Sequence, residues 1–206
     1  MKSLKAVVAS LAVSLFVSFS VSAADGSKGK ATNLKVNATK SELTWNAKKV
    51  TGEHTGKISL KEGVITLNGN KLVGGSFVAD LNSITCVDLT DKSYNDKLIG
   101  HLKSDDFFSV EKHPTAKFVV TKAVAKSANV YDVTGDLTIK GITKPVSFPV
   151  TVTATPAGAE ATGKLVVDRS KYDIKYNSKS FFDVSALGDK MINDDFTIDV
   201  KLVAAK

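Results

Sequence analysis

The run from Val130 to Val150 constrains the fold of this chain more than any other stretch. From Val133 onward the odd positions are small or apolar and the even positions are polar, up to a break at Gly141. Successive side chains of a strand point to opposite faces, so this period of two predicts a strand. A second strand follows, with apolar residues at every second position from Val146. The pattern predicts a hairpin in an antiparallel sheet that is dry on one face and wet on the other.

The same alternation recurs along most of the chain and predicts about eight strands in total. Asn68-Gly69 is a strong signal for a short hairpin, because both residues tolerate positive φ. Gly74-Gly75 indicates a bulge or a sharp bend. Pro149 cannot donate to a sheet ladder, so we expect it at an edge or a bulge, where a barrel would be imperfectly closed. The predicted fold class is all-β. An antiparallel sheet of about eight strands closes into a barrel whose interior holds packed side chains or one slim ligand.

Helical spacing replaces the alternation in one segment between two of these strands. Tyr94, Leu98 and Leu102 recur every four residues and form one stripe of a helix. Thr90 or Asp91 can cap the start of this helix with a side-chain oxygen. The sequence therefore predicts a short helical insert in an otherwise all-β chain.

The end of this insert carries two large apolar residues that need burial. Gly100 is expected to end a first helical segment, and a second turn is expected from His101 to Phe108. Phe107 and Phe108 follow an acidic pair, so a polar surface lies next to an apolar one. We expect the insert to act as a plug or lid over one end of the sheet.

The first residues have the pattern of an export signal. Lys2 and Lys5 give a short positive region, and Ala6–Val21 is apolar apart from a few serines. Small residues up to Ala23 suit cleavage by signal peptidase, which predicts a periplasmic or secreted protein. The alternative, a membrane anchor, is disfavoured because the apolar run is shorter than the roughly 20 residues that a spanning helix needs. The expected division is a signal peptide at 1–23, a flexible lead-in at 24–32 and a barrel domain at 33–206.

The charge pattern argues against a nucleic-acid partner. The formal net charge is +7, but the basic residues are nearly all Lys, with Arg169 the only Arg, and they are scattered along the strands. Nucleic-acid binders usually cluster Arg and Lys in one patch with aromatic residues. Scattered Lys side chains are typical of a solvated surface and of protected strand edges. A weak, transient contact with an anionic membrane surface is compatible with this charge.

The His and Cys residues form no recognisable catalytic or metal motif. His54, His101 and His113 are the only His, and they make neither H-E-x-x-H nor a Cys/His cluster with metal spacing. The chain also lacks a G-x-S-x-G elbow, a P-loop and a dinucleotide fingerprint. We therefore expect no enzyme activity, no cofactor and no metal, with a zinc site built from the three His as the remaining alternative. Cys86 is the only Cys, which excludes an internal disulfide. A buried apolar role near a strand end is favoured over an intermolecular disulfide or a reactive thiol.

Several co-linear blocks resemble the YceI-like family. The block His101–Phe118 reads H-L-K-S-D-D-F-F-S-V-E-K-H-P-T-A-K-F and is similar to the family's central signature. Tyr131–Val146 resembles its second signature, Ser41–Gly52 its opening strands and Asp168–Tyr176 its late segment. The resemblance implies an eight-stranded antiparallel, lipocalin-like barrel with a helical insert, exported to the periplasm. It also implies an elongated apolar cavity for a polyisoprenoid, such as an isoprenoid quinone or polyprenyl phosphate, or another long amphiphile.

The candidate ligand-binding residues are apolar side chains on the inward faces of the predicted strands and in the insert. The strand positions are Trp45, Phe77, Phe118, Leu137, Ile139, Phe148, Leu165, Val167, Phe196 and Ile198. The expected lid residues are Leu102, Phe107 and Phe108. The expected rim residues, near a polar head group, are His101, Asp168 and Arg169. The guanidinium fork of Arg169 suits a phosphate, and pairing with a carboxylate is the alternative.

The expected function is to hold a long-chain lipid for transport, storage or a stress response. The same apolar residues are also compatible with a filled core. In that alternative the protein is an exported interaction or stress protein whose filled barrel acts as a scaffold. The sequence leaves open which lipid is bound and whether the protein forms a homodimer.

Overall fold

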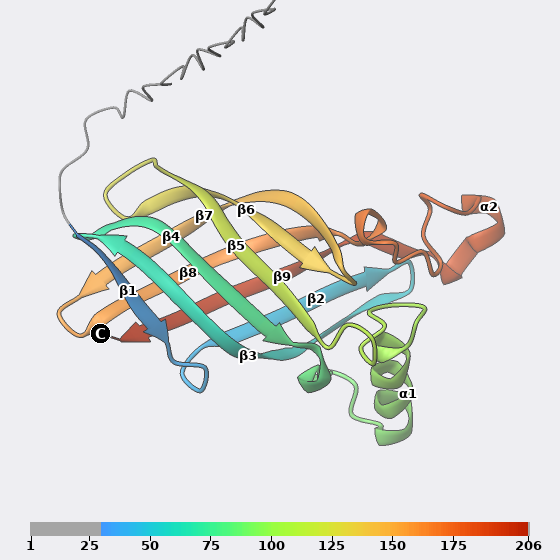
Figure 1. Ribbon diagram of the computed structural model, residues 1–206. Coiled ribbons are helices and arrows are strands. Elements are labelled where there is room, and N and C mark those ends of the chain that lie inside the picture. The colour runs from blue at the N-terminus through green and yellow to red at the C-terminus, as the bar shows by residue number, and fades with distance from the viewer. Residues whose placement is uncertain (1–29, 206) are drawn as a thin grey trace, which may run out of the picture.

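In the computed structural model, which describes residues 30–205, nine strands pair antiparallel around a closed barrel (Figure 1). The strands are β1 (Ala31–Val36), β2 (Glu42–Lys49), β3 (Gly52–Asn68), β4 (Lys71–Asp80), β5 (Thr115–Ala125), β6 (Val130–Ile139), β7 (Ile142–Thr155), β8 (Gly158–Asp168) and β9 (Ile192–Ala205). Because β1 and β2 both pair with β3 and with β9, they share one place in the barrel. The nine strands thus fill eight positions, and the predicted eight-stranded antiparallel barrel is confirmed.

The start of the barrel lies slightly earlier than the sequence predicted. The expected signal peptide at 1–23 lies outside the described residues. Ala31 and Thr32, which we expected in a flexible lead-in, belong to β1 because they pair with Asn68 and Leu67 of β3. No helix among the described residues is long and apolar enough to cross a membrane.

The predicted β3–β4 hairpin and its irregularity are both present. Gly69 adopts a φ of 59° in the turn, and Asn68 pairs with Lys71 across it. The register then shifts, because Leu67 pairs with Leu72 while the preceding residue of β3 pairs with Gly74. The predicted bulge is therefore one residue before Gly74-Gly75, and it increases the local twist of β4.

Pro149 occupies an edge-like position inside the closed barrel. It pairs with Asp132 of β6, but β7 pairs with β8 only from Val150 onward. Residues 142–149 of β7 therefore have a strand partner on one side only. A residue without an N–H is tolerated at such a position. The local break in closure expected at Pro149 is thus found as a seam between the first half of β7 and the second half of β8.

The helical insert differs in part from its predicted form. Helix α1 (Lys92–Lys103) starts at Asp91, whose carboxylate accepts the backbone N–H of Tyr94 at 3.0 Å, as expected for a cap. Gly100 does not end the helix, which continues for three more residues. Tyr94 is 63% exposed and does not belong to the buried stripe, whereas Leu98 and Leu102 pack against the cluster around Trp45. Figure 1 places α1 and the short helix α2 (Val184–Leu187) at the same end of the barrel. We call this end the mouth.

Three single-turn 3₁₀ helices complete the elements: η1 (Leu81–Ser83), η2 (Arg169–Tyr172) and η3 (Gly188–Lys190). The buried apolar residues form three clusters. The first fills the end opposite the mouth, around Leu34, Ile65 and Val133. The other two lie toward the mouth, one around Val167 and Ile174 and one around Trp45. The interior between these clusters is where the candidate site lies.

Candidate functional site: an apolar cavity inside the barrel

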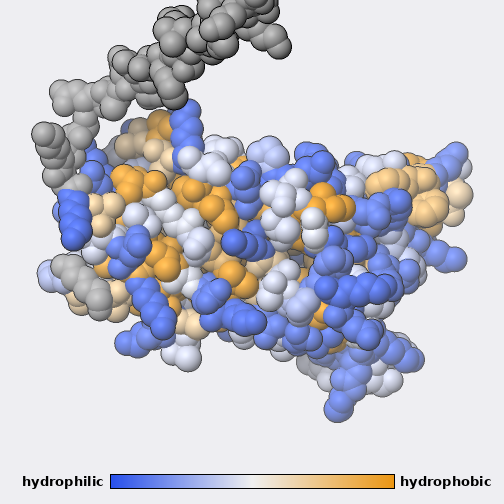
Figure 2. All heavy atoms as spheres, viewed as in Figure 1, coloured by the Kyte–Doolittle hydropathy of each residue, from blue (hydrophilic) through white to orange (hydrophobic). Residues whose placement is uncertain are grey.

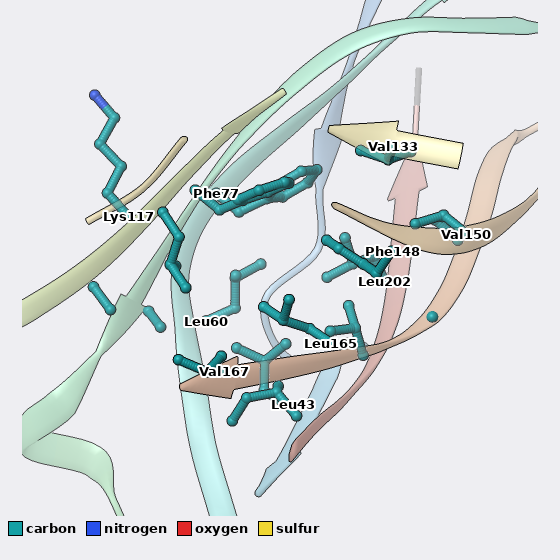
Figure 3. Close-up of a pocket in the computed structure, with 18 of the residues that line it drawn as sticks. Leu43, Leu60, Phe77, Lys117, Val133, Phe148, Val150, Leu165, Val167 and Leu202 are labelled. Atoms are coloured by element: carbon teal, nitrogen blue, oxygen red, sulfur yellow. The ribbon is translucent and has the colours of Figure 1, made fainter. Parts of the chain in front are cut away.

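The barrel encloses a cavity of about 160 Å³. Its wall is built from the inward, apolar positions of β2 to β9, and Figure 3 shows Leu60, Phe77 and Leu165 directed into it. Two residues with polar side chains, Thr162 and Lys117, also contribute to the wall. Figure 3 shows the amine of Lys117 directed away from the cavity. An apolar cavity of about 150 Å³ in another protein stays dry and holds benzene, so this space suits a hydrocarbon group better than water.

Three neighbouring Phe rings form part of the wall of this cavity, which we call the inner cavity. The ring centroids of Phe77 and Phe118 lie 6.5 Å apart, and those of Phe118 and Phe148 lie 5.6 Å apart. Gly135, a buried position of β6, makes room for them. A Cβ at this position would lie 2.4 Å from the Phe118 ring. The glycine therefore leaves the space that the Phe118 ring occupies.

A second, smaller cavity of about 50 Å³ lies closer to the mouth. Its wall includes Trp45 and Arg169. This outer cavity shares Ile58, Phe108 and Phe196 with the inner cavity. The rings of Phe108 and Phe196 meet edge to face at 6.2 Å, so this pair lies between the two spaces.

The structure places every predicted pocket and lid residue on the wall of one of the two cavities. The inner wall contains Phe77, Phe108, Phe118, Leu137, Ile139, Phe148, Leu165, Val167, Phe196 and Ile198. The outer wall contains Trp45, Leu102, Phe107, Phe108 and Phe196. Their contact with a ligand stays a prediction. The sequence analysis missed further wall residues that lie on the same inward faces, among them Leu43, Leu60, Ile65, Leu72, Val133, Val150, Val152, Ala161 and Leu202. The period of two is the signal that would have found them.

Arg169 does not present its guanidinium to solvent at the rim, where we expected it. Its side chain is 4% exposed and donates to four backbone carbonyls at 2.9–3.0 Å. The acceptors are the carbonyls of Ile174, Tyr176, Ile192 and Asn193. The carboxylate of Asp194 lies 3.6 Å away, so the alternative role of pairing with an acid is the one observed. Arg169 thus links the β8–β9 connection to the start of β9. Its guanidinium N–H groups are used in these hydrogen bonds.

The other two rim candidates make local contacts. His101 packs edge-on against Phe107 and Tyr176, at 4.9 and 4.4 Å between ring centroids, and its Nε2 lies 3.2 Å from a carboxylate oxygen of Asp106. Asp168 accepts the backbone N–H and the hydroxyl of Ser170, as the cap of a 3₁₀ turn. Burial raises the pKa of the Asp168 carboxyl, but these hydrogen bonds and a nearby Lys outweigh it and lower the pKa overall. His101 therefore lies beside the mouth, whereas Asp168 caps a 3₁₀ turn of the backbone.

The three His do not come together among the residues that the structure describes. His101 lies beside Asp106, and His113 lies against Gly141. His54 instead contacts Asp88 at 2.9 Å, and Cys86 lies next to this pair. The zinc site built from three His, left open above, is therefore not formed in the described chain.

Apolar side chains are exposed on the connection that surrounds α2. Phe181, Phe182 and Val184 are 43%, 52% and 55% exposed. Figure 2 shows this apolar group on the part of the molecule where Figure 1 places α2, at the mouth. The amine of Lys175 lies 5.4 Å from the centroid of the Phe181 ring. The mouth therefore offers an apolar surface with a cation beside it.

Eight antiparallel positions around an apolar interior define a lipocalin-like barrel. A family model described as the YceI-like domain matches residues 34–204, and the chain therefore belongs to the YceI-like family. This confirms the resemblance seen in the sequence blocks.

Curated relatives and solved structures agree with this assignment. A UPF0312 protein of Pseudomonas putida strain W619 is 46% identical over 66 residues, which is 31% of this chain and 34% of that protein. The crystal structure of BcnA from Burkholderia cenocepacia matches with a TM-score of 0.64 and 27% identity, over 83% of this chain and 99% of that one. A polyisoprenoid binding domain from Saccharophagus degradans, implicated in plant cell wall breakdown, matches with a TM-score of 0.60 and 16% identity. That match covers 85% of this chain and 99% of the other. The matched segment spans about a third of the length of the curated relative, whereas the structural matches span nearly the whole barrel.

Proposed function

We propose that this protein binds the hydrocarbon tail of a long-chain lipid, in particular a polyisoprenoid, inside the barrel. The observation that carries the proposal is the inner cavity, whose wall is almost entirely apolar. Burial of a CH₂ group contributes about 0.8 kcal/mol, so a five-carbon isoprene unit contributes up to about 4 kcal/mol before entropic costs. The fold is shared with a solved polyisoprenoid binding domain, which supports this choice of ligand.

The head group would lie at the mouth, where three cations already have partners. Lys175, the cation beside Phe181, pairs with the carboxylate of Asp173 at 2.8 Å. Arg169 donates to backbone carbonyls, as described above. Lys140 also donates to carbonyls at the mouth, those of Asp105 and Asp173, at 3.3 and 3.2 Å. Cations engaged in this way are poorly placed to neutralise a phosphate. We therefore favour an isoprenoid quinone over a polyprenyl phosphate.

We propose that the protein acts at a membrane surface outside the cytoplasm. Lipid tails are taken from and returned to membranes, and the exposed Phe181, Phe182 and Val184 would meet a bilayer surface first. The export signal expected from the first residues would bring the protein to the periplasm or the medium. The role is transport or storage of the lipid by binding rather than by catalysis. A scaffold with a filled barrel is disfavoured by the inner cavity.

The fluorescence of Trp45, the only Trp of the chain, tests this proposal because its side chain lies on the wall of the outer cavity. We expect an isoprenoid quinone to quench this fluorescence and to saturate at one equivalent. The same quinone ring without its tail should bind at least about 100-fold more weakly, because it lacks the buried carbons. Equal quenching by the tailed and tailless quinones would contradict the proposal.

Phe108 is predicted to limit the length of the chain that fits. Phe108→Ala removes the ring between the inner and outer cavities and joins them. We expect the preferred tail to lengthen by about one isoprene unit, with at least about a 10-fold gain in affinity for the longer tail relative to the shorter one. Affinities for a series of quinones that differ only in tail length measure this shift. Phe181→Ala, an exposed ring outside both cavities, is the control, and an unchanged length preference in Phe108→Ala would refute the prediction.

A further inference from the structure

We propose that His54, Cys86 and Asp88 form a binding site for a divalent transition-metal ion, with Zn²⁺ as the ion that their donor atoms suit best. The site is separate from the two apolar cavities, whose walls do not include these residues. It joins the edge of β3 to the chain that follows η1.

The distances between the three side chains fit one metal ion. One donor atom from each residue lies within 4.8 Å of the other two. Nδ1 of His54 lies 2.9 Å from one carboxylate oxygen of Asp88, and Sγ of Cys86 lies 3.3 Å from the other. Ligand atoms that share a tetrahedral Zn²⁺, at bond lengths of about 2.0–2.3 Å, lie roughly 3–4 Å apart. Small rotations of these side chains would therefore close the site around an ion.

The backbone holds the three residues in place before any ion binds. The chain after η1 runs along β3, with the N–H of Thr85 donating to the carbonyl of Lys57 and the N–H of Val87 donating to that of Thr55, both at 2.9 Å. This close approach requires Gly56, where a Cβ would lie 1.7 Å from the Thr85 carbonyl oxygen. Backbone hydrogen bonds therefore fix the positions of the three ligands relative to one another. This lowers the entropic cost of forming a metal site.

The donor set is a carboxylate, an imidazole and a thiol, and Zn²⁺ binds the thiol as a thiolate once its proton has left. Burial raises the pKa of the Asp88 carboxyl, but the Thr55 N–H and the side chains of His54 and Cys86 outweigh it and bring the pKa to about 2. Asp88 is therefore ionised at neutral pH. Burial also raises the pKa of the Cys86 thiol. On binding, the S–H proton of Cys86 leaves to solvent as the sulfur–zinc bond forms, and neutral His54 supplies a ring lone pair.

Exposure of the cluster leaves room for a fourth ligand. Cys86 is 7% exposed, whereas the side chains of His54 and Asp88 are 30% and 34% exposed. Three protein ligands with one side open to solvent is the arrangement in which zinc keeps a water molecule. This cluster could not be predicted from residue spacing, because His54 lies far from the other two ligands along the chain and forms no recognised metal motif with them.

The test is a titration of the purified, tag-free protein with Zn²⁺ against a chelating indicator dye, after treatment with EDTA. We expect one equivalent to bind, and Co²⁺ in its place to give a sulfur-to-metal charge-transfer band. Cys86→Ser and His54→Gln should each weaken Zn²⁺ binding by about 100-fold or more. His101→Gln is the matched control, because His101 also contacts a carboxylate, that of Asp106, and should leave Zn²⁺ binding unchanged.

A second measurement on the unaltered protein keeps the test independent of how the variants fold. Zn²⁺ should slow the reaction of Cys86 with a thiol reagent by at least about 10-fold, in parallel with occupancy of the site. Failure to take up Zn²⁺, binding that survives Cys86→Ser, or a thiol reaction rate that Zn²⁺ does not change would each overturn the proposal.

Discussion

Replacing Arg169 by methionine is expected to lower the free energy of unfolding by about 3–5 kcal/mol. The guanidinium is buried and donates to four carbonyls at 2.9–3.0 Å, with the carboxylate of Asp194 at 3.6 Å. Methionine fills much of the same space but removes the donor to these four carbonyls and the cation beside Asp194. The carboxylate of Asp194 keeps only the hydroxyl of Ser180, at 2.7 Å from its other oxygen. Urea unfolding measures the loss, and the melting temperature should fall by about 10 °C for a chain of this size.

Lys164→Met is the matched control for this prediction. Lys164 also pairs with an acid, Asp199 at 3.2 Å, but both side chains are more than half exposed. Exposed ion pairs contribute about 0–1 kcal/mol, so the control should change stability by no more than that. If Arg169→Met and Lys164→Met lost the same small amount, Arg169 would not hold the β8–β9 connection in the way described.

Replacing Ala161 by phenylalanine should abolish binding of the lipid tail. Ala161 is buried on β8, lies on the wall of the inner cavity, and pairs with Val152 and Leu202 on the neighbouring strands. A benzene-sized ring fills a cavity of about this volume. If the ring displaces about four carbons of the tail, the loss is about 3 kcal/mol, or at least about 100-fold in affinity. The Trp45 titration with an isoprenoid quinone measures the change.

Thr153→Phe is the control for the filled cavity. Thr153 is exposed on β7 and pairs with Glu160, one residue before Ala161, so its ring would point outward from the same part of the sheet. This variant should bind the quinone as the unaltered protein does. Quinone affinity that is unchanged in a folded Ala161→Phe protein would place the tail outside the inner cavity.

The walls of both cavities could be predicted because the signal for them is local. Alternation along a strand decides which side chains share a face, and closure of the sheet then brings those faces together. Phe77, Phe118 and Phe148 come from three strands, yet each was assigned inward from its own neighbours in the sequence. Pro149 was likewise predicted at an edge from its missing N–H alone.

Features that depend on distant backbone could not be predicted in this way. The guanidinium of the sole Arg suited a phosphate or a carboxylate, but the donors of Arg169 go to four carbonyls whose positions follow from the β8–β9 connection. Tyr94 fitted the helical stripe, but it is 63% exposed, whereas Leu98 and Leu102 of the same stripe pack against the cluster around Trp45. The cluster of His54, Cys86 and Asp88 exists because the chain after η1 returns along β3. The spacing of residues in the sequence does not predict contacts between segments that lie far apart along the chain.

Native mass spectrometry of the protein, isolated from its own cells without detergent, tests the central claim most directly. The account predicts a stoichiometric adduct that leaves on solvent extraction and is identified as a polyisoprenoid, with an isoprenoid quinone as the expected species. The same adduct should be missing from Ala161→Phe and present on Thr153→Phe. A bare polypeptide mass, together with failure to take up added isoprenoid quinone, would contradict a lipid-binding barrel.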